Sequence, residues 1–277
     1  MRDGVFNKEI NLIFADIGGN MTISGAKFDS LLNLTGAHIK SEMSLASDTE
    51  SKPVWGEHSR LVLRNTAVGC VQTPPDLDAF PKDLDLDGYS YTRLGGLGSV
   101  DSESEMASRP PEWFIEWLNR DRSYSPQPYQ QLAEVLRAMG HSGKANNILY
   151  AGKERERSEL IKRKKVLRWF GMSLLNWTIG YGYGYRYFYS LFWVIGFTII
   201  GAWVFSTTVA GKCFSPGETF AFSFDLLLPL VKFDESHYKI PFSCFGDWQR
   251  YYFYAHKLVG YVLGSFVVAG LTGITKK

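Results

Sequence analysis

An eleven-residue repeat in the first half of the chain restricts its fold more than any other feature of the sequence. Its unit reads [ML]-x-[IL]-x-Gly-Ala-x-[IF], with apolar residues two apart followed by small residues. The recurring positions are Ala15, Ala26 and Ala37; Ile17, Phe28 and Ile39; Met21, Leu32 and Met43; and Ile23, Leu34 and Leu45. A spacing of two is the period of a strand, and a fixed long period is typical of stacked coils. The repeat therefore predicts a parallel β-solenoid over residues 1–95, whose turns contain two units each or form a triangular coil.

The first coil of such a stack needs a cap, because each coil buries its apolar residues only against its neighbours. Gly4, Phe6, Ile10 and Leu12 already follow the repeat. Two interpretations remain open for this end. Either looped residues cap it, or it is an open β-edge on which a protein partner stacks.

Residues 96–170 connect the predicted solenoid to the rest of the chain. Residues 96–126 form a linker that contains a short amphipathic helix, with Trp113, Phe114, Trp117 and Leu118 on one face. That face either packs on the protein or lies on a membrane surface. Residues 127–170 predict a helical hairpin, broken at Gly140-His-Ser-Gly143, and then a basic helix. We interpret the hairpin as a bracket between the solenoid and the basic helix.

Two long apolar segments follow, and they predict a two-span membrane domain over residues 171–277. Residues 191–211 carry no charge over about 20 residues, which suffices to cross a hydrocarbon core. Residues 258–274 are also uncharged. The expected spans cover about 189–211 and 255–274. Eight Lys and Arg residues lie between 153 and 168, so the positive-inside rule predicts a bacterial inner-membrane protein with both termini in the cytoplasm.

Those basic residues and the aromatic residues after them predict a contact with lipid headgroups rather than with nucleic acid. The expected headgroup ligands are Lys162, Arg163, Lys164, Lys165, Arg168 and Arg186. The net charge of the chain is only +2, which also argues against a nucleic-acid-binding protein. Membrane lipids are therefore the predicted partner of this segment.

The segment Thr178-Ile-Gly-Tyr-Gly182 has the letters of a potassium-channel selectivity filter. In a channel, a first span and a pore helix precede the filter. Here a row of cations occupies the place where that span would have to be. We therefore interpret residues 181–193 as an aromatic belt at the membrane interface.

A short apolar segment between the spans, residues 218–231, is a better candidate for a pore. Its polar residues are Glu218, Ser223 and Asp225. Ionisable groups at membrane depth are costly and indicate function. Two interpretations remain: a re-entrant helix that lines or gates a pore, or a helix that lies flat at the interface. In the second span, Gly260 and Gly264 suit close helix packing.

Cysteine usage leaves one question open. Cys213 and Cys244 both fall in the predicted outward loop, where they either form a disulfide or remain two buried thiols. The third cysteine, Cys70, belongs to the cytoplasmic half and is expected to be reduced.

Four stretches together resemble a group of bacterial membrane-anchored proteins with pentapeptide-like repeats. They are LDLDGYSYTRL, PQPYQQLAEVLRAMGH, the GYGY segment, and SFDLLLPLV before a last segment ending VAGLTGI. Some members are labelled membrane-associated oxidoreductase, which implies a redox cofactor. This chain has no GxGxxG after a strand and no CxxC, so we expect no cofactor and no metal.

The function predicted from the sequence is not enzymatic, because the five histidines are scattered and no catalytic constellation can be matched by spacing. We expect a homo-oligomer whose two-span domain forms or gates a pore under control of the solenoid. Such a protein would act as an ion channel or as a membrane-depolarising effector in phage defence. The alternative is a membrane-anchored scaffold that binds a partner and whose spans are inert.

Overall fold

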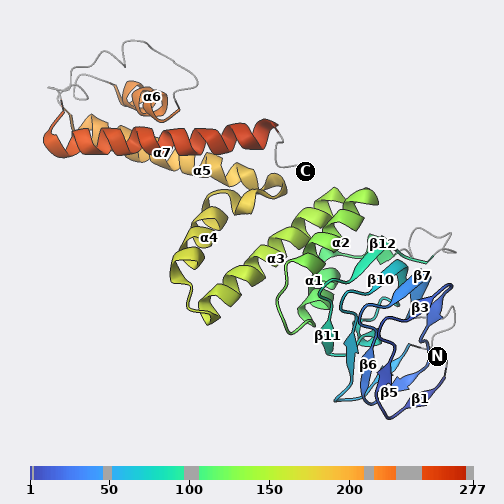
Figure 1. Ribbon diagram of the computed structural model, residues 1–277. Helices are drawn as coiled ribbons and strands as arrows, with labels where there is room; N and C mark the ends of the chain where they lie inside the picture. The colour runs from blue at the N-terminus through green and yellow to red at the C-terminus, as the bar shows by residue number, and fades with distance from the viewer. Residues whose placement is uncertain (2, 46–51, 97–105, 209–214, 229–244, 273–277) are drawn as a thin grey trace. The chain divides into compact units, whose positions relative to one another are not determined.

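The structure is a computed structural model that describes residues 1, 3–45, 52–96, 106–208, 215–228 and 245–272. It divides into two compact units, Met1–Lys165 and Val166–Lys277 (Figure 1). The first contains all the described strands and three α-helices, and the second is helical.

Twelve short strands form three small parallel sheets in the first unit. Their bounds are β1 Val5–Phe6, β2 Ile10–Asn11, β3 Asp16–Ile17, β4 Met21–Thr22, β5 Lys27–Phe28, β6 Leu31–Asn33, β7 His38–Ser44, β8 Val54–Trp55, β9 Arg60–Val62, β10 Ala67–Gln72, β11 Asp83–Asp85 and β12 Ser90–Leu94. The strand orders are β1-β5-β8, β2-β6-β9-β11 and β3-β7-β10-β12, and β4 also pairs with β7.

Strand pairing in this unit follows from the repeat. Val5 pairs with Lys27, Ile10 with Leu32 and Asp16 with His38, so the partners are two eleven-residue units apart. Residues at one repeat position therefore stack on one another and bury the same face. Ile23, Leu34 and Leu45 are fully buried in the core, and Phe28 stacks between the rings of Phe6 and Trp55.

The predicted fold class, a β-solenoid followed by two transmembrane helices, is wrong. In the first unit, the described strands form three separate small sheets and not a closed solenoid. The sheet of β1, β5 and β8 has three strands only, because the 3₁₀ turn η1, Leu77–Ala79, lies beside β8 in place of a further strand. The indole N–H of Trp55 donates to the carbonyl oxygen of Ala79 across that junction, at 2.7 Å.

Three helices complete the first unit: α1 Pro111–Asn119, α2 Gln127–Ala138 and α3 Ser142–Lys162. Phe114, Trp117 and Leu118 of α1 are buried in the same core as the strands. Side chains from this region also bind backbone groups beside the last strands. Asp121 accepts from the N–H of Leu86 at 3.1 Å, and Gln131 donates to the carbonyl of Tyr91 at 2.7 Å. These bonds satisfy groups at the end of the sheets that would otherwise be left without partners.

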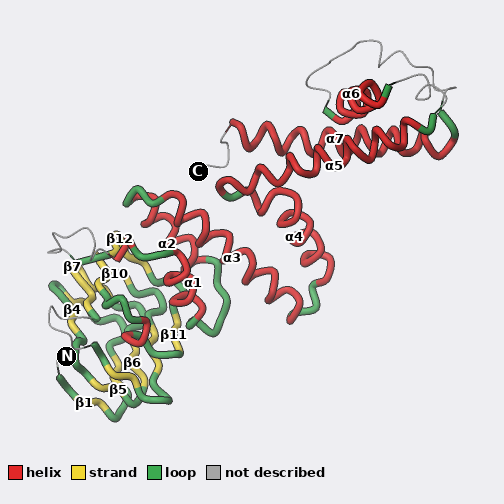
Figure 2. The backbone as a smooth tube through the Cα atoms, turned by 180° about the vertical axis from the view of Figure 1, so that it is seen from behind, coloured by secondary structure: helices red, strands yellow, loops and turns green. Residues whose placement is uncertain are grey.

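The second unit consists of α4 Val166–Ile179, the 3₁₀ turns η3 Gly180–Gly182 and η4 Gly184–Phe188, α5 Tyr189–Ser206, α6 Pro216–Leu227 and α7 Asp247–Thr272. Helices α5 and α7 run side by side, and α6 packs on both of them (Figures 1 and 2). Helix α4 leaves this group at the chain reversal before α5.

Only one helix within the described residues is long and apolar enough to cross a membrane. This run is Gly184–Ser206, and its most apolar window of 18 residues has a mean hydropathy of 1.8. The second predicted span, over its described residues, is not apolar enough by the same criterion of length and mean hydropathy. Helix α7 begins at Asp247, and its first three turns contain Arg250, His256 and Lys257 as well. These polar residues lower the mean hydropathy of the helix, and a prediction based on its apolar second half overlooked them.

Candidate functional site

A cluster of buried polar side chains lies between α5, α6 and α7, and we call it the buried polar cluster. Its members are Thr198 on α5, Ser223 on α6, and Tyr252 and His256 on α7. Thr198 and Ser223 have no exposed surface, His256 is 2% exposed, and Tyr252 at the edge of the cluster is half-buried. Burial of this kind is costly unless each polar atom has a partner.

Hydrogen bonds connect the members of the buried polar cluster. The hydroxyl of Ser223 donates to the carbonyl of Thr198 at 2.9 Å. Nε2 of His256 lies 3.1 Å from the carbonyl oxygen of Ser223 and 3.4 Å from its Oγ, and Nδ1 lies 3.2 Å from the hydroxyl of Tyr252. A carbonyl can only accept, so Nε2 carries the proton, and Nδ1 accepts from the Tyr252 hydroxyl.

This arrangement does not suit the chemistry of a serine nucleophile. A general base has to accept the proton of the hydroxyl that it activates. In the buried polar cluster the Nε2 atom that faces Ser223 is itself a donor, and the Ser223 hydroxyl is directed to the Thr198 carbonyl. The cluster instead joins three helices through bonds that are strong in a low-dielectric interior.

Glycine on α5 makes room for the buried polar cluster. A Cβ atom at Gly201 would lie 2.1 Å from Oγ of Ser223 and 2.7 Å from Cε1 of His256. The ring of Phe205, one turn along α5, meets the His256 ring edge-on, with centroids 5.7 Å apart. Any larger residue at position 201 would displace Ser223 or His256.

The three predicted pore residues lie in two different environments. Ser223 belongs to the buried polar cluster, and Asp225 is also fully buried on α6. Glu218 is exposed at the start of α6, where it forms a capping box with Ser215. The backbone N–H of Ser215 donates to Oε2 of Glu218 at 2.6 Å, so this carboxylate stabilises the helix terminus.

Two further predictions for this half of the chain concern glycines that pack the second span and a pair of cysteines. Gly260 lies against the end of α6, where an added Cβ would be 1.8 Å from the carbonyl oxygen of Leu227. Gly264 is buried on α7. Cys213 and Cys244 lie outside the described residues, so their pairing stays a prediction.

The filter-like segment forms a tight reversal between α4 and α5. Gly180, Tyr181, Gly182 and Gly184 all have positive φ, between 54° and 79°. Gly180 and Gly182 are buried, and an added Cβ at Gly182 would lie 2.5 Å from the hydroxyl of Tyr187. Glycine recurs here because successive left-handed residues and close contacts exclude side chains. The tight turn therefore accounts for the glycines of this segment without a selectivity filter.

The predicted headgroup ligands fall around α4 and at the start of α5. Lys162, Arg163, Lys164 and Lys165 are exposed at the end of α3, and Arg168 is exposed in the first turn of α4. Lys162 pairs with Glu159 at 2.6 Å. The guanidinium of Arg186, in η4, lies over the ring of Tyr185 at 5.3 Å.

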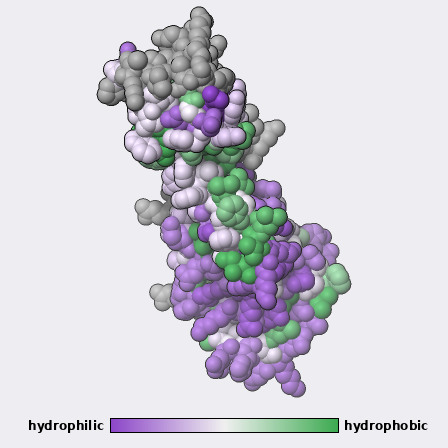
Figure 3. Space-filling view, turned by 90° about the vertical axis from the view of Figure 1, so that its left-hand side faces the viewer, coloured by the Kyte–Doolittle hydropathy of each residue, from purple (hydrophilic) through white to green (hydrophobic). Residues whose placement is uncertain are grey.

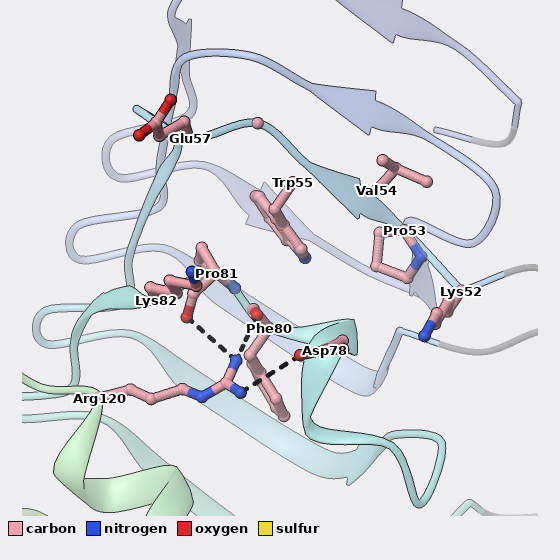
Figure 4. Close-up of a pocket in the computed structure, with 11 residues that line it drawn as sticks. Lys52, Pro53, Val54, Trp55, Glu57, Asp78, Phe80, Pro81, Lys82 and Arg120 are labelled. Carbon is pink, nitrogen blue, oxygen red and sulfur yellow. Dashed lines mark hydrogen bonds and ion pairs between the residues drawn. The ribbon is translucent and has the colours of Figure 1, made fainter.

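A crevice of about 490 Å³ opens in the first unit (Figure 4). It lies between β8 and residues 78–82, which include the end of the 3₁₀ turn η1. Trp55, Phe80 and Pro81 supply apolar surface, and Lys52, Lys82 and Arg120 supply positive charge. Arg120 donates to the carbonyls of Leu77 and Phe80 at 2.7 and 2.6 Å, so its guanidinium is held in place by the fold.

Lys52 at the rim of the crevice is paired as well. Its ammonium group binds Asp76, and this hydrogen bond raises the pKa of Lys52 and lowers the pKa of Asp76. The acidic residues Glu57 and Asp78 also line the crevice, so its charge is mixed. The sequence analysis did not find this crevice, because its walls come from three segments with no shared motif.

The comparisons with known proteins identify no relative. No family model matches the chain, and no curated protein or solved structure is significantly similar to it. The resemblance to membrane-anchored pentapeptide-like-repeat proteins therefore stays a prediction.

Proposed function

We propose that the protein is a scaffold that α5 anchors in a lipid bilayer, with the N-terminal unit available to a partner. The proposal keeps the second of the two functions expected from the sequence. It requires a single membrane segment, and one helix among the described residues is long and apolar enough to serve as one.

The observation that carries the proposal is the reversed polarity of the helical unit. Large apolar side chains on α5 are exposed: Leu191, Phe192, Ile195, Ile199, Ile200 and Trp203. Polar side chains are buried inside the unit: Ser190, Thr198, Ser223, Asp225, Gln249 and His256. A helical unit in water shows the opposite arrangement, with its apolar residues inside. Lipid is the solvent that favours an apolar exterior.

The burial of α5 also argues against its being the core helix of a water-soluble domain. Only 33% of its apolar window is buried. Aromatic residues are exposed toward both ends of the run, with Tyr185 and Phe188 at the start and Trp203 near its end. Aromatic side chains of this kind are enriched at the two interfaces of a bilayer.

The anchoring is tested with protein synthesised in a cell-free system in the presence of phosphatidylcholine vesicles. The wild-type chain is expected to float with the vesicles and to resist extraction at alkaline pH. The double variant Ile195→Lys/Ile199→Lys should remain in the soluble or aggregated fraction, because charges in mid-bilayer cost about 2.5–3.5 kcal/mol each. Unfloated wild-type protein, or a double variant that floats equally well, would overturn the proposal.

A matched control introduces the same charges elsewhere. Val5 and Phe14 in the first unit are exposed apolar residues as well, 66% and 78% exposed. The variant Val5→Lys/Phe14→Lys should float like the wild type. A loss of flotation in this control as well would show that added charge alone prevents the association.

Pore formation, the first function predicted from the sequence, stays a prediction. It assumed two membrane spans, and only one helix among the described residues is long and apolar enough to be a span. Ser223 and Asp225 are buried in helix packing, and Glu218 caps α6. The same vesicles test it when they are loaded with a self-quenching dye or a potassium indicator. Leakage that Asp225→Asn abolishes would support a pore, and vesicles that stay sealed after insertion would support the scaffold.

A further inference from the structure

Helix α4 carries an uncovered stripe of large apolar side chains. We define the α4 stripe as Val166, Leu167, Phe170, Leu174 and Trp177, all of which are exposed. Leu167 is 87% exposed and Trp177 70%. Successive residues of an α-helix are rotated by about 100°, so these five side chains occupy roughly a third of the helix circumference. Hydrophobic surface gathers in the middle of the space-filling view, at the level of α4, whereas most of the N-terminal unit is hydrophilic (Figure 3).

The other side of α4 rests on the protein. Trp169, Met172, Ser173 and Asn176 are half-buried, and Ile179 at the end of the helix is buried. At the same rotation per residue, Met172, Asn176 and Ile179 lie roughly opposite to the α4 stripe, whereas Ser173 lies next to it. The helix therefore has one face that its own unit partly covers and one face that the described residues leave open.

Cationic residues come immediately before the α4 stripe in the chain. Arg163, Lys164 and Lys165 are exposed, and none of them forms an ion pair with another described residue. Lys164 has a φ of 55°, and the N–H groups of Lys164 and Lys165 donate to the carbonyls of Ile161 and Leu160. These bonds form a Schellman motif, whose left-handed position is usually occupied by glycine. A lysine at this position costs stability, because a residue with a Cβ atom is strained in the left-handed conformation.

The start of α5 lies next to the far end of α4. The indole N–H of Trp193 on α5 donates to the carbonyl of Trp177 at 3.0 Å. The two indole rings meet edge-on, with centroids 4.9 Å apart. If α5 enters a bilayer, this contact holds the end of α4 near the bilayer surface.

We infer that α4 is an interfacial helix that binds the surface of an anionic bilayer. The α4 stripe enters the boundary between headgroups and acyl chains, and Arg163, Lys164 and Lys165 bind the negatively charged headgroups. A helix with an apolar face that adjoins a cluster of cations in the chain is typical of binding to anionic lipid surfaces. Nucleic acid would use the cations but would leave the Leu, Phe and Val side chains of the stripe in water.

This inference rests on the proposed anchoring by α5 and adds a property to it. Burial of α5 does not depend on lipid charge, whereas each lysine near an anionic surface contributes about fivefold to binding, a factor that falls as salt rises. The protein should therefore prefer membranes that contain acidic lipids, and α4 should leave the surface at high ionic strength while α5 stays inserted.

The test places an environment-sensitive fluorophore on the α4 stripe of the full chain. The probe is attached to Phe170→Cys, with Cys213→Ser and Cys244→Ser to leave no other accessible thiol, since Cys70 is buried. Vesicles contain phosphatidylcholine alone or mixed with phosphatidylserine. We expect a blue shift of the probe emission, and quenching by spin labels at shallow depth, only in the mixed vesicles and at low salt.

Charge-reversal variants separate the headgroup contact from other effects. Lys164→Glu/Lys165→Glu should abolish the blue shift and leave flotation of the chain unchanged. The matched control Lys8→Glu/Lys82→Glu reverses two exposed lysines of the first unit and should behave like the wild type. A probe that stays in water in both kinds of vesicle, while the chain floats, would overturn the inference and leave the proposed function intact.

Two other results would overturn it as well. A blue shift that appears without vesicles and grows with protein concentration would mean that a second copy covers the α4 stripe. A shift produced by RNA and not by mixed vesicles would mean that the cations serve nucleic acid. Failure of every variant to float would instead count against the anchoring by α5.

Discussion

Two glycines of the helical unit lie where backbone and side chains of neighbouring helices come closest. Gly201 faces Ser223 and His256 of the buried polar cluster, and Gly260 faces the backbone at Leu227. The two contacts differ in what can move. Around Gly201 the neighbours are side chains, whereas the nearest atoms to Gly260 are a carbonyl group and a Cα.

Gly260→Ala is therefore expected to destabilise the packing of α6 on α7. The added methyl group would meet the carbonyl oxygen of Leu227, which cannot rotate away, and overpacking of this kind costs about 1–3 kcal/mol. Gly196→Ala on α5 is the matched control, because nothing lies within 4 Å of its Cβ position. It should gain about 0.5–1 kcal/mol from helix propensity.

Thermal unfolding of the full chain in detergent and hydrogen exchange of the α6 amides measure both effects. Equal stability of the two alanine variants would show that α6 does not pack against Gly260 in solution.

At the level of elements, left-handed residues flank α4 in the chain on both sides, in one turn before it and one after it. The first is the Schellman motif at Lys164, and the second is the reversal at Gly180–Gly182. The second has glycines at its most crowded positions. The first has a lysine, which is a local conflict between residue and backbone.

Lys164→Gly should raise the free energy of unfolding of the α3 terminus by roughly 0.5–1 kcal/mol, because glycine adopts the left-handed conformation without strain. The same change removes a cation and should weaken the response of the Phe170 probe in anionic vesicles. Hydrogen exchange at the α3 terminus and the probe emission measure these opposite effects. A variant that is both less stable and unchanged in lipid response would contradict the assignment of the motif and the role of the charge.

On the scale of the whole molecule, the two units differ in where their apolar residues lie. The first unit has one hydrophobic core, formed by the strands together with α1, α2 and α3. The side chains of Asp121 and Gln131 bind backbone groups beside β11 and β12, so the strands and helices of this unit stabilise each other. The second unit has two small buried clusters, around Phe205 and Leu227, but exposes many of its large apolar residues, among them Phe192 and Trp203.

A chain of residues 1–165 is expected to be soluble and to unfold cooperatively without detergent, since it contains this complete core. A chain of residues 1–179 adds α4 with its uncovered stripe and should aggregate or bind vesicles. Size-exclusion chromatography and circular dichroism compare the two. Aggregation of the shorter chain would show that its core depends on the helical unit.

The sequence by itself determined which strands pair. A repeat of constant length puts equivalent residues on top of one another, so the stacking of Phe6 on Phe28, which are two repeat units apart, could be anticipated from spacing. Trp55 follows Phe28 after a longer interval, so its place on this stack could not. It also determined that residues 189–206 form an apolar helix, because hydropathy is a property of the residues alone.

Tertiary structure alone decided the rest, because those features depend on contacts between residues that are distant in the chain. Whether the repeat closes into a solenoid depended on η1, which lies beside β8 in place of a strand. Ser223 was a pore candidate by sequence, but its partner His256 lies 33 residues away on α7. No spacing rule connects these two residues, and only the packing of three helices brings them into contact.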